Sequence, residues 1–488
     1  DRIDYERDGA TYPVYRDPGP PPLLAGNSEE ADAYLWGFEL VLAWSAHLDP
    51  SDGAMLDISP GTLGNLEALP TTEDEVRAFY DVLDGGDPST GHAVNPHTGQ
   101  PYASQRVPRG DYTRVLAEFW ADGPDSETPP GHWFTILNSV NDDPRLERRF
   151  EGTGPLLDPL EWDVKAYFAL GGAMHDVAVA VWGLKGWYDY IRPISAIRAM
   201  GDRGQRSDPS QPGYDPAGVA LRPGLVEVIQ AGDPLAGPTG EHVGKLKAWA
   251  WLGPDAIEDP ATDTAGVGWI RIEDWWPYQR PTFITPPFAG YVSGHSTFSR
   301  AAAEVLTQLT GDPFFPGGLG SFQAPQNAFL VFEQGPSVDV DLQWATYRDA
   351  ADQCALSRIW GGIHPPADDL PGRTLGAEIG PASFAYARTY FDGTATSVEL
   401  EAPGAARSLS VYPNPAVRDQ IVMVEGGRPG ARFEVLDLLG RIVQRGQVNA
   451  GITRIDTGSV SSGLYLVRVA DGLDIDTARL LITNGASR

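Results

Sequence analysis

Apolar residues recur at intervals of three and four over most of residues 30–392, the spacing that places them on one face of an α-helix. Glycine- and proline-rich loops separate these stretches, and some loops are long, such as Asp202–Gly224 and Ala231–Glu241. Long loops are uncommon unless they line a functional site or lie over the core. The pattern predicts a mainly α first domain, residues 1–392, with helices at Ala31–Leu48, Glu73–Leu83, Tyr112–Trp120, Leu160–Tyr190, Ser296–Leu309, Asp341–Trp360 and Pro366–Tyr390.

Beyond residue 408 the pattern changes to strict alternation of apolar and polar residues, which is typical of half-buried strands. Glycine or proline interrupts these runs every 8–12 residues or so. We expect a small antiparallel β-sandwich over residues 408–488, joined to the first domain by a small, polar linker at residues 393–407. The expected strands are Leu409–Val411, Gln420–Val424, Arg432–Leu438, Arg441–Gln444, Thr453–Asp456, Leu464–Val469 and Ala478–Ile482.

Charge is distributed unevenly between the same two regions. The 488-residue chain has 36 basic and 66 acidic residues, a net charge of −30. Residues 405–488 hold 10 arginines and 8 acids, so residues 1–404 hold 26 basic and 58 acidic residues. The acidic balance argues against nucleic acid and anionic membranes as partners. The longest apolar stretch, around Ala166–Leu184, contains His175 and Asp176, so we expect no membrane span.

Three short segments carry the residues of one candidate anion site. In the first, K-x6-R-P, Lys185 and Arg192 are seven residues apart, so two helical turns could place them on one face. Pro193 disfavours the α conformation at Arg192, which predicts that the arginine lies where the helix stops. Taken alone, the segment also fits a solvated basic face.

The second segment, Ser293–Gly294–His295, precedes a helix-forming run. It predicts a loop that enters a helix N-terminus, where free amides and the helix dipole favour an anion. Gly294 permits close approach of the backbone, Ser293 adds a hydroxyl, and His295 would be a proton shuttle. Taken alone, it also fits an ordinary N-cap beside a partly buried histidine.

The third segment is Ser357–Arg358 followed by His364, S-R-x5-H. Arg358 can donate two parallel hydrogen bonds to an oxyanion. His364 would be a nucleophile toward phosphorus or a ligand to a metal oxyanion, with Asp368 orienting its ring. Alone, it also fits a helix-end arginine and a loop histidine, but the three segments together favour one pocket for a tetrahedral or trigonal-bipyramidal oxyanion.

The ordered set of three segments resembles the superfamily of type 2 phosphatidic acid phosphatases, bacterial acid phosphatases and vanadium-dependent haloperoxidases. The spacing within each segment matches. Val292 stands where the family usually has proline, and about 100 residues separate Pro193 from Ser293, a longer gap than is usual in the phosphatases. That gap and the stretch Trp182–Arg198 look more like the large bacterial haloperoxidases. The resemblance implies a helical-bundle catalytic domain of this type.

The resemblance also implies the site roles. Vanadate is the implied cofactor, with His364 bound to its vanadium. Lys185, Arg192, Ser293, Gly294 and Arg358 would contact its oxygens, and the implied catalytic residues are His295, Lys185 and His364. Trp182 and Phe288 match positions that line the halide pocket, although both are also plausible core aromatics. The implied substrates are hydrogen peroxide, a halide and a small organic acceptor.

The tail carries a second resemblance. The segments Leu409–Pro415, Val435–Val443, Gly463–Val469 and Ala478–Thr483 look like the C-terminal sorting domain of type IX secretion cargo. This implies export through the periplasm of a Bacteroidetes-like cell, an outer-membrane secretion machinery as partner, and a secreted or cell-surface protein. A carbohydrate-binding or adhesive sandwich is the alternative for the tail.

Three functions therefore compete. The first is a secreted vanadium-dependent haloperoxidase, a peroxide:halide oxidoreductase that forms hypohalous acid and halogenates organic substrates. The second is an acid phosphatase of the same superfamily with a phosphohistidine intermediate on His364. The third is a non-enzymatic surface adhesion protein that keeps a vestigial pocket.

Overall fold

Most of the predicted apolar faces do form helices. The computed structural model describes residues 2–86, 89–121, 127–395, 409–426, 429–437, 440–449, 452–471 and 474–484. The chain divides into two units, Asp1–Ala395 and Thr396–Arg488. Most of the expected linker, residues 393–407, lies outside the described residues.

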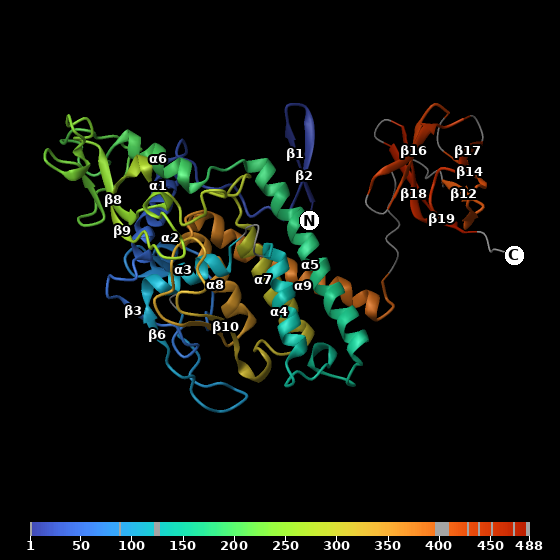
Figure 1. Cartoon of the computed structure of the whole chain (residues 1–488), viewed down its shortest axis with the longest axis horizontal. Coiled ribbons are helices and arrows are strands. Elements are labelled where there is room, and N and C mark those ends of the chain that lie inside the picture. The colour runs from blue at the N-terminus through green and yellow to red at the C-terminus, as the bar shows by residue number, and fades with distance from the viewer. Residues whose placement is uncertain are drawn as a thin grey trace. The chain divides into compact units, whose positions relative to one another are not determined.

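The first unit is mainly helical (Figure 1). Its helices are α1 (Ser28–Trp44), α2 (Glu73–Phe79), α3 (Arg109–Phe119), α4 (Pro129–Asp142), α5 (Pro159–Tyr188), α6 (Pro193–Arg203), α7 (Gly294–Thr310), α8 (Tyr347–Trp360) and α9 (Pro366–Phe391). Its strands form small antiparallel sheets: β1 (Arg2–Arg7) with β2 (Ala10–Tyr15), β3 (Met55–Asp57) with β6 (Arg106–Pro108), β4 (Tyr80–Asp81) with β5 (Gly85–Gly86), β10 (Gly320–Ala324) with β11 (Val340–Trp344), and β7 (Val226–Val228) with β8 (Leu246–Trp251) and β9 (Val267–Arg271).

Helix α7 is the central element of the first unit, packed against α4, α5, α8 and α9 (Figure 1). Its contact with α9 is close because α9 presents Gly372, Gly376 and Gly380 at intervals of four. A Cβ atom at these glycines would lie 2.9, 2.5 and 2.6 Å from carbonyl oxygens of α7 or its N-cap residue Ser293. Glycine therefore lets the two backbones approach, and it fixes the start of α7 against the start of α9.

Three expectations for this unit are corrected. Asp341–Trp344 is part of strand β11, not of a helix, because Val340, Leu342 and Trp344 are buried in alternation. The helix expected at Glu73–Leu83 ends at Phe79, after which Tyr80–Asp81 pairs with Gly85–Gly86. The helix expected at Leu160–Tyr190 ends at Tyr188.

Among the described residues, one stretch, Pro159–Arg203, is long and apolar enough to cross a membrane by length and composition. The core helices of soluble proteins pass the same test. Here the stretch comprises two helices, α5 and α6, and α5 packs against α7 and α9. The absence of a membrane span stays a prediction.

The second unit has two sheets that enclose one apolar core, so the expected sandwich is confirmed. One sheet has the order β12 (Ser410–Tyr412), β14 (Ile421–Glu425), β17 (Ile452–Asp456). The other has the order β13 (Ala416–Val417), β19 (Asp474–Thr483), β18 (Gly463–Asp471), β15 (Arg432–Leu436), β16 (Ile442–Gln447). The pairing is antiparallel except between β13 and β19, which run parallel.

Candidate anion-binding active site

Lys185 and Arg192 lie on different elements, which corrects the expectation that one helix face holds both. Lys185 is in the last turn of α5, and Asp189, in the left-handed conformation with φ 47°, ends that helix. Arg192 is extended and occupies the N-cap position of α6, as Pro193 after it requires. The turn between the helices brings both side chains to the same loop, residues 288–290.

Backbone carbonyls of that loop hold the two cations. Lys185 Nζ donates to the carbonyl oxygens of Ala289 and Gly290 at 2.8 and 2.7 Å. Arg192 Nε donates to Phe288 at 3.0 Å, and Nη2 donates to Ala289 at 3.2 Å. Burial lowers the pKa of Lys185 well below its usual range, and the charge of Arg192 lowers it further. A bound anion would relieve both effects.

The segment Ser293–Gly294–His295 enters helix α7, as the sequence predicts. Ser293 is the N-cap residue, and its Oγ accepts a hydrogen bond from the Ser296 amide at 3.3 Å and lies 2.8 Å from the Ser296 hydroxyl oxygen. Gly294 is the first helical residue. The first amides of a helix have no intrahelical acceptor, so this end of α7 presents donors and positive potential to its surroundings.

His295 is buried and has one ring nitrogen without a partner. Its ring donates a hydrogen bond to the backbone carbonyl of Trp120, and among the described residues Nε2 has no hydrogen-bond partner. In the neutral ring one nitrogen donates to the Trp120 carbonyl and the other keeps a lone pair. Burial lowers the pKa of His295 well below its usual range, and the charge of Arg358 adds to this.

His364 is oriented by a carboxylate on one side and an arginine on the other. Helix α8 ends at Trp360 with Gly361 as its C-cap, and Gly362, with φ 76°, turns the chain toward His364. Nδ1 lies 2.7 Å from Asp368 Oδ2, and Nε2 lies 3.1 Å from Arg192 Nη1. Because arginine can only donate, Nε2 accepts, and the ring proton is on Nδ1. Nε2 is thus the ring nitrogen whose lone pair could bind a ligand.

Asp368 and Arg358 are two further buried ionisable residues of the site. Burial raises the pKa of Asp368 to about 7. Arg358 is fully buried, and its Nη1 donates to the Trp120 carbonyl at 2.8 Å. Its charge contributes to lowering the pKa of His295, His364 and Arg192, the last to about 10, although burial is the largest cause in each case. Arg358 therefore faces the same centre as the other two cations.

A cavity of about 360 Å³ lies at this centre. Six of the nine residues named from the sequence line it: Trp182, Arg192, Phe288, Gly294, His295 and His364. The other three, Lys185, Ser293 and Arg358, are buried. The Phe288 ring lies 5.2 Å from the Trp182 ring and 5.4 Å from both Lys185 Nζ and the guanidinium carbon of Arg192. An aromatic wall thus faces the cationic one.

The donor set fits a small oxyanion such as vanadate or phosphate. It offers three buried cations, a serine hydroxyl and a helix N-terminus to the oxygens, and the Nε2 lone pair of His364 to the central atom. Fixed donors of this kind stabilise a multiply charged anion without rearrangement. Among the described residues, no group of three or more His, Cys, Asp or Glu side chains is arranged to hold a metal ion.

Several contacts that build the site gave no sequence signal. The carbonyls of Trp120, Phe288, Ala289 and Gly290 belong to residues whose side-chain type does not matter for the bond. Ser296 was also missed, although its hydroxyl donates to Asp369 Oδ1 at 2.5 Å and its oxygen lies 2.8 Å from Ser293 Oγ. Its position three residues after an N-cap serine was the available clue.

Comparison with known proteins agrees with both resemblances stated above. Residues 165–393 match the family model of the VCPO second helical-bundle domain, and residues 410–483 match the secretion system C-terminal sorting domain. The sorting domain indicates a secreted or cell-surface protein. Both resemblances, and with them the predicted fold class, are confirmed.

Solved structures give weaker likeness. A holo-type bacterial vanadium-dependent chloroperoxidase is 17% identical with a TM-score of 0.38, over 57% of this chain and 44% of that one. A bacterial vanadium-dependent iodoperoxidase is 21% identical with a TM-score of 0.29, over 56% and 43%. PorZ, a surface component of the type IX secretion system of Porphyromonas gingivalis, is 24% identical with a TM-score of 0.15, over 19% and 13%. This chain thus spans less than half of either peroxidase. No curated protein matches.

Proposed function

We propose that this chain, whose residues 165–393 belong to the VCPO second helical-bundle family, is a secreted vanadate-dependent haloperoxidase. It uses hydrogen peroxide to oxidise a halide X⁻ to hypohalous acid, in the balance H₂O₂ + X⁻ + H⁺ → HOX + H₂O. The observation that carries the proposal is the cavity lined by Arg192, His295 and His364. The charges of Arg192, Lys185 and Arg358 all act on His364, whose pKa they help to lower. Hypohalous acid then halogenates an organic acceptor.

In this proposal vanadate is held by the donors described above. His364 would bind vanadium through the Nε2 lone pair, which accepts from Arg192 in this structure. Lys185, Arg192 and Arg358 would neutralise the oxygens, together with the Ser293 hydroxyl and the Gly294 amide. Vanadate supplies a Lewis acid that activates peroxide without changing its own oxidation state. Asp368 keeps the proton of His364 on Nδ1, which leaves Nε2 for the metal.

His295 moves the protons. The lone pair of its neutral ring accepts a proton from incoming peroxide, and the ring returns one to the oxygen that leaves as water. The bond from the ring to the Trp120 carbonyl fixes the ring for this role. Lys185, with two of its three N–H groups on carbonyls, retains one donor for the reacting oxygen.

Trp182 and Phe288 form the wall that the halide meets. Their rings pack against each other, and both line the same cavity as His364 and Arg192. Aromatic surface replaces water around a halide, which makes the anion a better nucleophile. This wall does not select one halide, so chloride, bromide and iodide are all candidates.

The second candidate is an acid phosphatase with the same residues. The specific observation in its favour is that His364 Nε2 is an unprotonated nitrogen backed by a carboxylate, as a nucleophile requires. His364 would take the phosphoryl group, His295 would protonate the leaving alcohol, and water would then release phosphate. The cationic pocket would serve equally well.

One paired assay separates the candidates. The full chain is incubated with orthovanadate, hydrogen peroxide and each halide in turn, and halogenation of a phenol dye is followed by absorbance. Release of p-nitrophenol from p-nitrophenyl phosphate is measured in parallel without vanadate. Vanadate-dependent halogenation is expected. Phosphate ester cleavage without halogenation would select the phosphatase. If neither activity is found, the non-enzymatic adhesion protein is the remaining candidate.

A further inference from the structure

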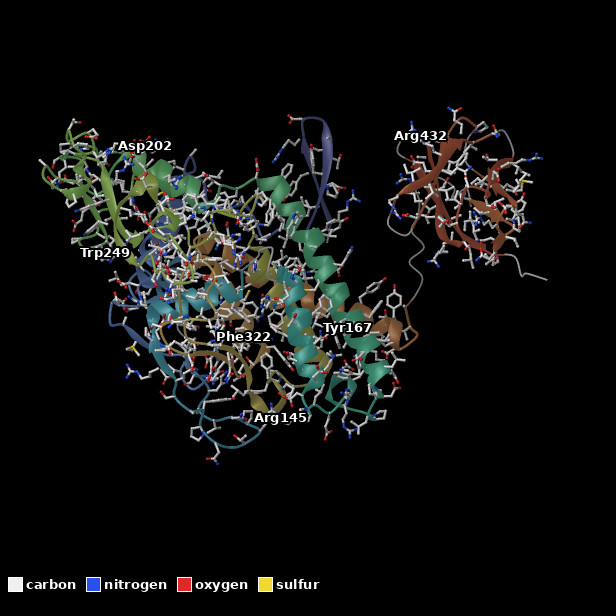
Figure 2. All side chains as sticks on the ribbon, viewed as in Figure 1. Arg145, Tyr167, Asp202, Trp249, Phe322 and Arg432 are labelled. Atoms are coloured by element: carbon white, nitrogen blue, oxygen red, sulfur yellow. The ribbon has the colours of Figure 1, made fainter. Side chains whose placement is uncertain are left out.

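A second cavity, of about 470 Å³, lies in the first unit, and its size suits a small organic molecule. Side chains from α3, α4, β10, β11 and the loops around them line it. Figure 2 labels Phe322 and Arg145, which both belong to the lining. Its aromatic members are Phe119, Phe315, Phe322, Phe329 and Trp344. Flat apolar surface of this kind favours a flat aromatic ligand.

The second cavity shares a wall with the anion cavity. The short segment Glu127–His132 contributes Glu127 and His132 to the aromatic cavity, and Thr128, Pro129 and Pro130 to the anion cavity. A second element links the two. Phe119 lines the aromatic cavity, and the carbonyl of the next residue, Trp120, holds His295 and Arg358. The residues of this shared wall therefore lie between a molecule in the aromatic cavity and the site at which hypohalous acid would form.

His132 provides a polar contact inside the aromatic cavity. It is only 6% exposed, and its ring is packed between Phe119 and Trp120 at centroid distances of 4.7 and 4.9 Å. Among the described residues, no hydrogen bond reaches its ring, and Nδ1 lies 3.6 Å from the Glu127 carboxylate. Burial lowers the pKa of His132, so the ring is neutral and can accept a hydrogen bond. The lone pair of this neutral ring could therefore accept a hydrogen bond from a ligand with an O–H or N–H group that fills the cavity.

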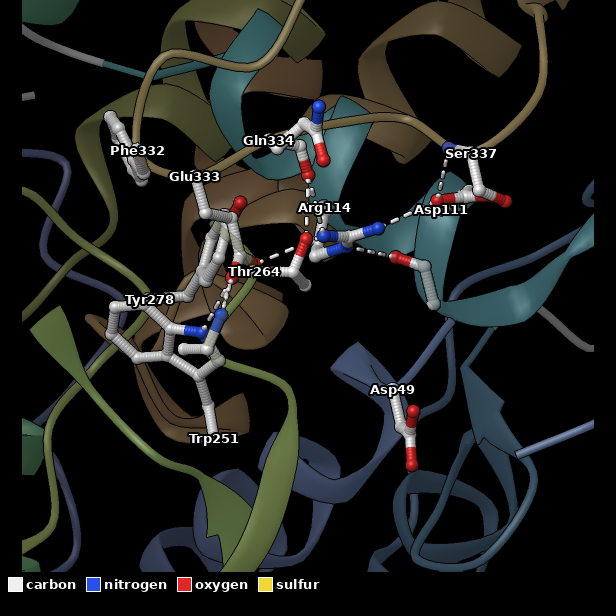
Figure 3. Close-up of polar contacts among 12 residues, drawn as sticks. Asp49, Asp111, Arg114, Trp251, Thr264, Tyr278, Phe332, Glu333, Gln334 and Ser337 are labelled. Carbon is white, nitrogen blue, oxygen red and sulfur yellow. Dashed lines mark hydrogen bonds and ion pairs between the residues drawn. The ribbon is translucent and has the colours of Figure 1, made fainter. Parts of the chain in front are cut away.

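The far wall of the aromatic cavity is held in place before any ligand binds. Glu118 accepts the amides of Val331 and Phe332 at 2.7 and 3.2 Å. Glu333, the next residue after Phe332, is held by an ion pair with buried Arg114, which also pairs with Asp111 (Figure 3). These contacts fix the loop that carries Phe329 and Val331, so the cavity is preformed and binding needs little reordering.

We infer that the aromatic cavity binds the organic acceptor of the proposed haloperoxidase, and that this acceptor is an electron-rich aromatic molecule of the phenol or indole class, with its O–H or N–H donated to His132. The inference rests on the proposed function for the reaction that follows. Hypohalous acid replaces a ring hydrogen by halogen, ArH + HOX → ArX + H₂O, a reaction that electron-rich rings undergo most readily. Halogenation would then occur on the protein instead of in free solution.

The binding test uses the full chain without vanadate, peroxide or halide. Isothermal titration calorimetry with 2-naphthol should give saturable binding. Ser139 is an exposed lining residue of α4. The larger side chain of Ser139→Trp should therefore fill the cavity from its rim without removing any core side chain. Binding should weaken by about tenfold or more in Ser139→Trp and stay within about twofold in Ser139→Ala, which loses the same hydroxyl but fills nothing.

A second pair tests the role of His132. His132→Phe keeps a ring between Phe119 and Trp120 but removes the acceptor, so 2-naphthol should bind about tenfold more weakly. 2-Methoxynaphthalene has no O–H group and should bind wild type and His132→Phe alike. Unfolding curves of each variant confirm that the fold is kept.

The outcomes distinguish this inference from the proposed function. If 2-naphthol does not bind saturably, or binds Ser139→Trp as it binds wild type, the inference is overturned even if halide oxidation is found. If the binding pattern holds but no halide is oxidised, the aromatic site stands and the proposed function fails. With active protein and bromide, the ratio of brominated 2-naphthol isomers should differ from that given by added hypobromous acid, and identical ratios would place the reaction in free solution.

Discussion

The backbone carbonyl of Trp120 accepts a hydrogen bond of 2.8 Å from Nη1 of Arg358. The same carbonyl accepts the ring N–H of His295. One backbone atom at the end of α3 therefore positions a cation and the proposed proton carrier together. The end of this helix thus supports the site, although no residue type there predicts such a role.

Replacing Arg358 by lysine tests how much the guanidinium shape matters. Lysine keeps the charge but cannot donate to Trp120 and to an oxyanion in the fixed fork of a guanidinium. We expect Arg358→Lys to bind vanadate at least about tenfold more weakly by calorimetry. Arg441→Lys, on the exposed side of the tail domain, is the matched control. Equal affinity in wild type and Arg358→Lys would show that charge alone suffices.

Replacing each of the two active-site histidines by alanine should have a different effect on vanadate binding and on turnover. His364→Ala removes the proposed vanadium ligand, so both vanadate binding and bromide oxidation should be lost. His295→Ala leaves all proposed oxyanion contacts in place and removes the proton carrier. It should still bind vanadate but turn over about a hundredfold or more slowly. Calorimetry measures binding, and the dye assay measures turnover. Bromide oxidation by His364→Ala at the wild-type rate would end the assignment.

Asp368 should act through His364. Its carboxylate accepts the Nδ1 proton at 2.7 Å, and asparagine would keep the shape but lose the charge. Loss of such a supporting carboxylate costs about 10- to 100-fold in metal affinity. We expect Asp368→Asn to weaken vanadate binding by this factor, measured by calorimetry at a fixed pH. Asp392→Asn, in the exposed cap of α9, provides the comparison. An unchanged affinity would leave the Asp368–His364 contact without a role in the site.

Much of the fold followed from the sequence because several of its helices are long. The spacing of three and four identified α5, α7 and α9, and the alternation beyond residue 408 identified the sandwich. Helices α4 and α6 were not predicted. Helix α4 begins with Pro129–Pro130–Gly131, which reads as a loop, and α6 is short and contains Gly201. Tertiary packing decides such segments.

The site was accessible from sequence only where side chains carry the contacts. Lys185, Arg192, His295 and His364 were named in advance because cations and imidazoles at fixed spacing have few alternative uses. The carbonyls that hold them, such as that of Trp120, leave no trace in the residue type. The aromatic cavity was equally invisible, since its lining comes from segments as far apart as Phe119 and Trp344.

The raised pKa of Glu118 predicts that the free energy of unfolding depends on pH. It is buried, accepts hydrogen bonds from Tyr278 and two amides, and burial raises its pKa from 4.5 to about 7. Between about pH 4.5 and 7 the folded protein keeps a proton on Glu118 that the unfolded chain releases. The folded state therefore loses stability as the pH rises through this window. Below pH 4.5 both states are protonated and the effect is absent.

Glu118→Gln removes this titration. The free energy of unfolding of wild type minus that of Glu118→Gln should fall by about 1.4 kcal/mol per pH unit between about pH 4.5 and 7, and then level off. Urea titrations of the full chain at several pH values measure it, with the transition of the first unit followed by tryptophan fluorescence. Glu378→Gln, which removes an exposed carboxylate, is the control for the change of charge. A difference that rises with pH would mean that the three hydrogen bonds to Glu118 outweigh its burial and lower the pKa instead.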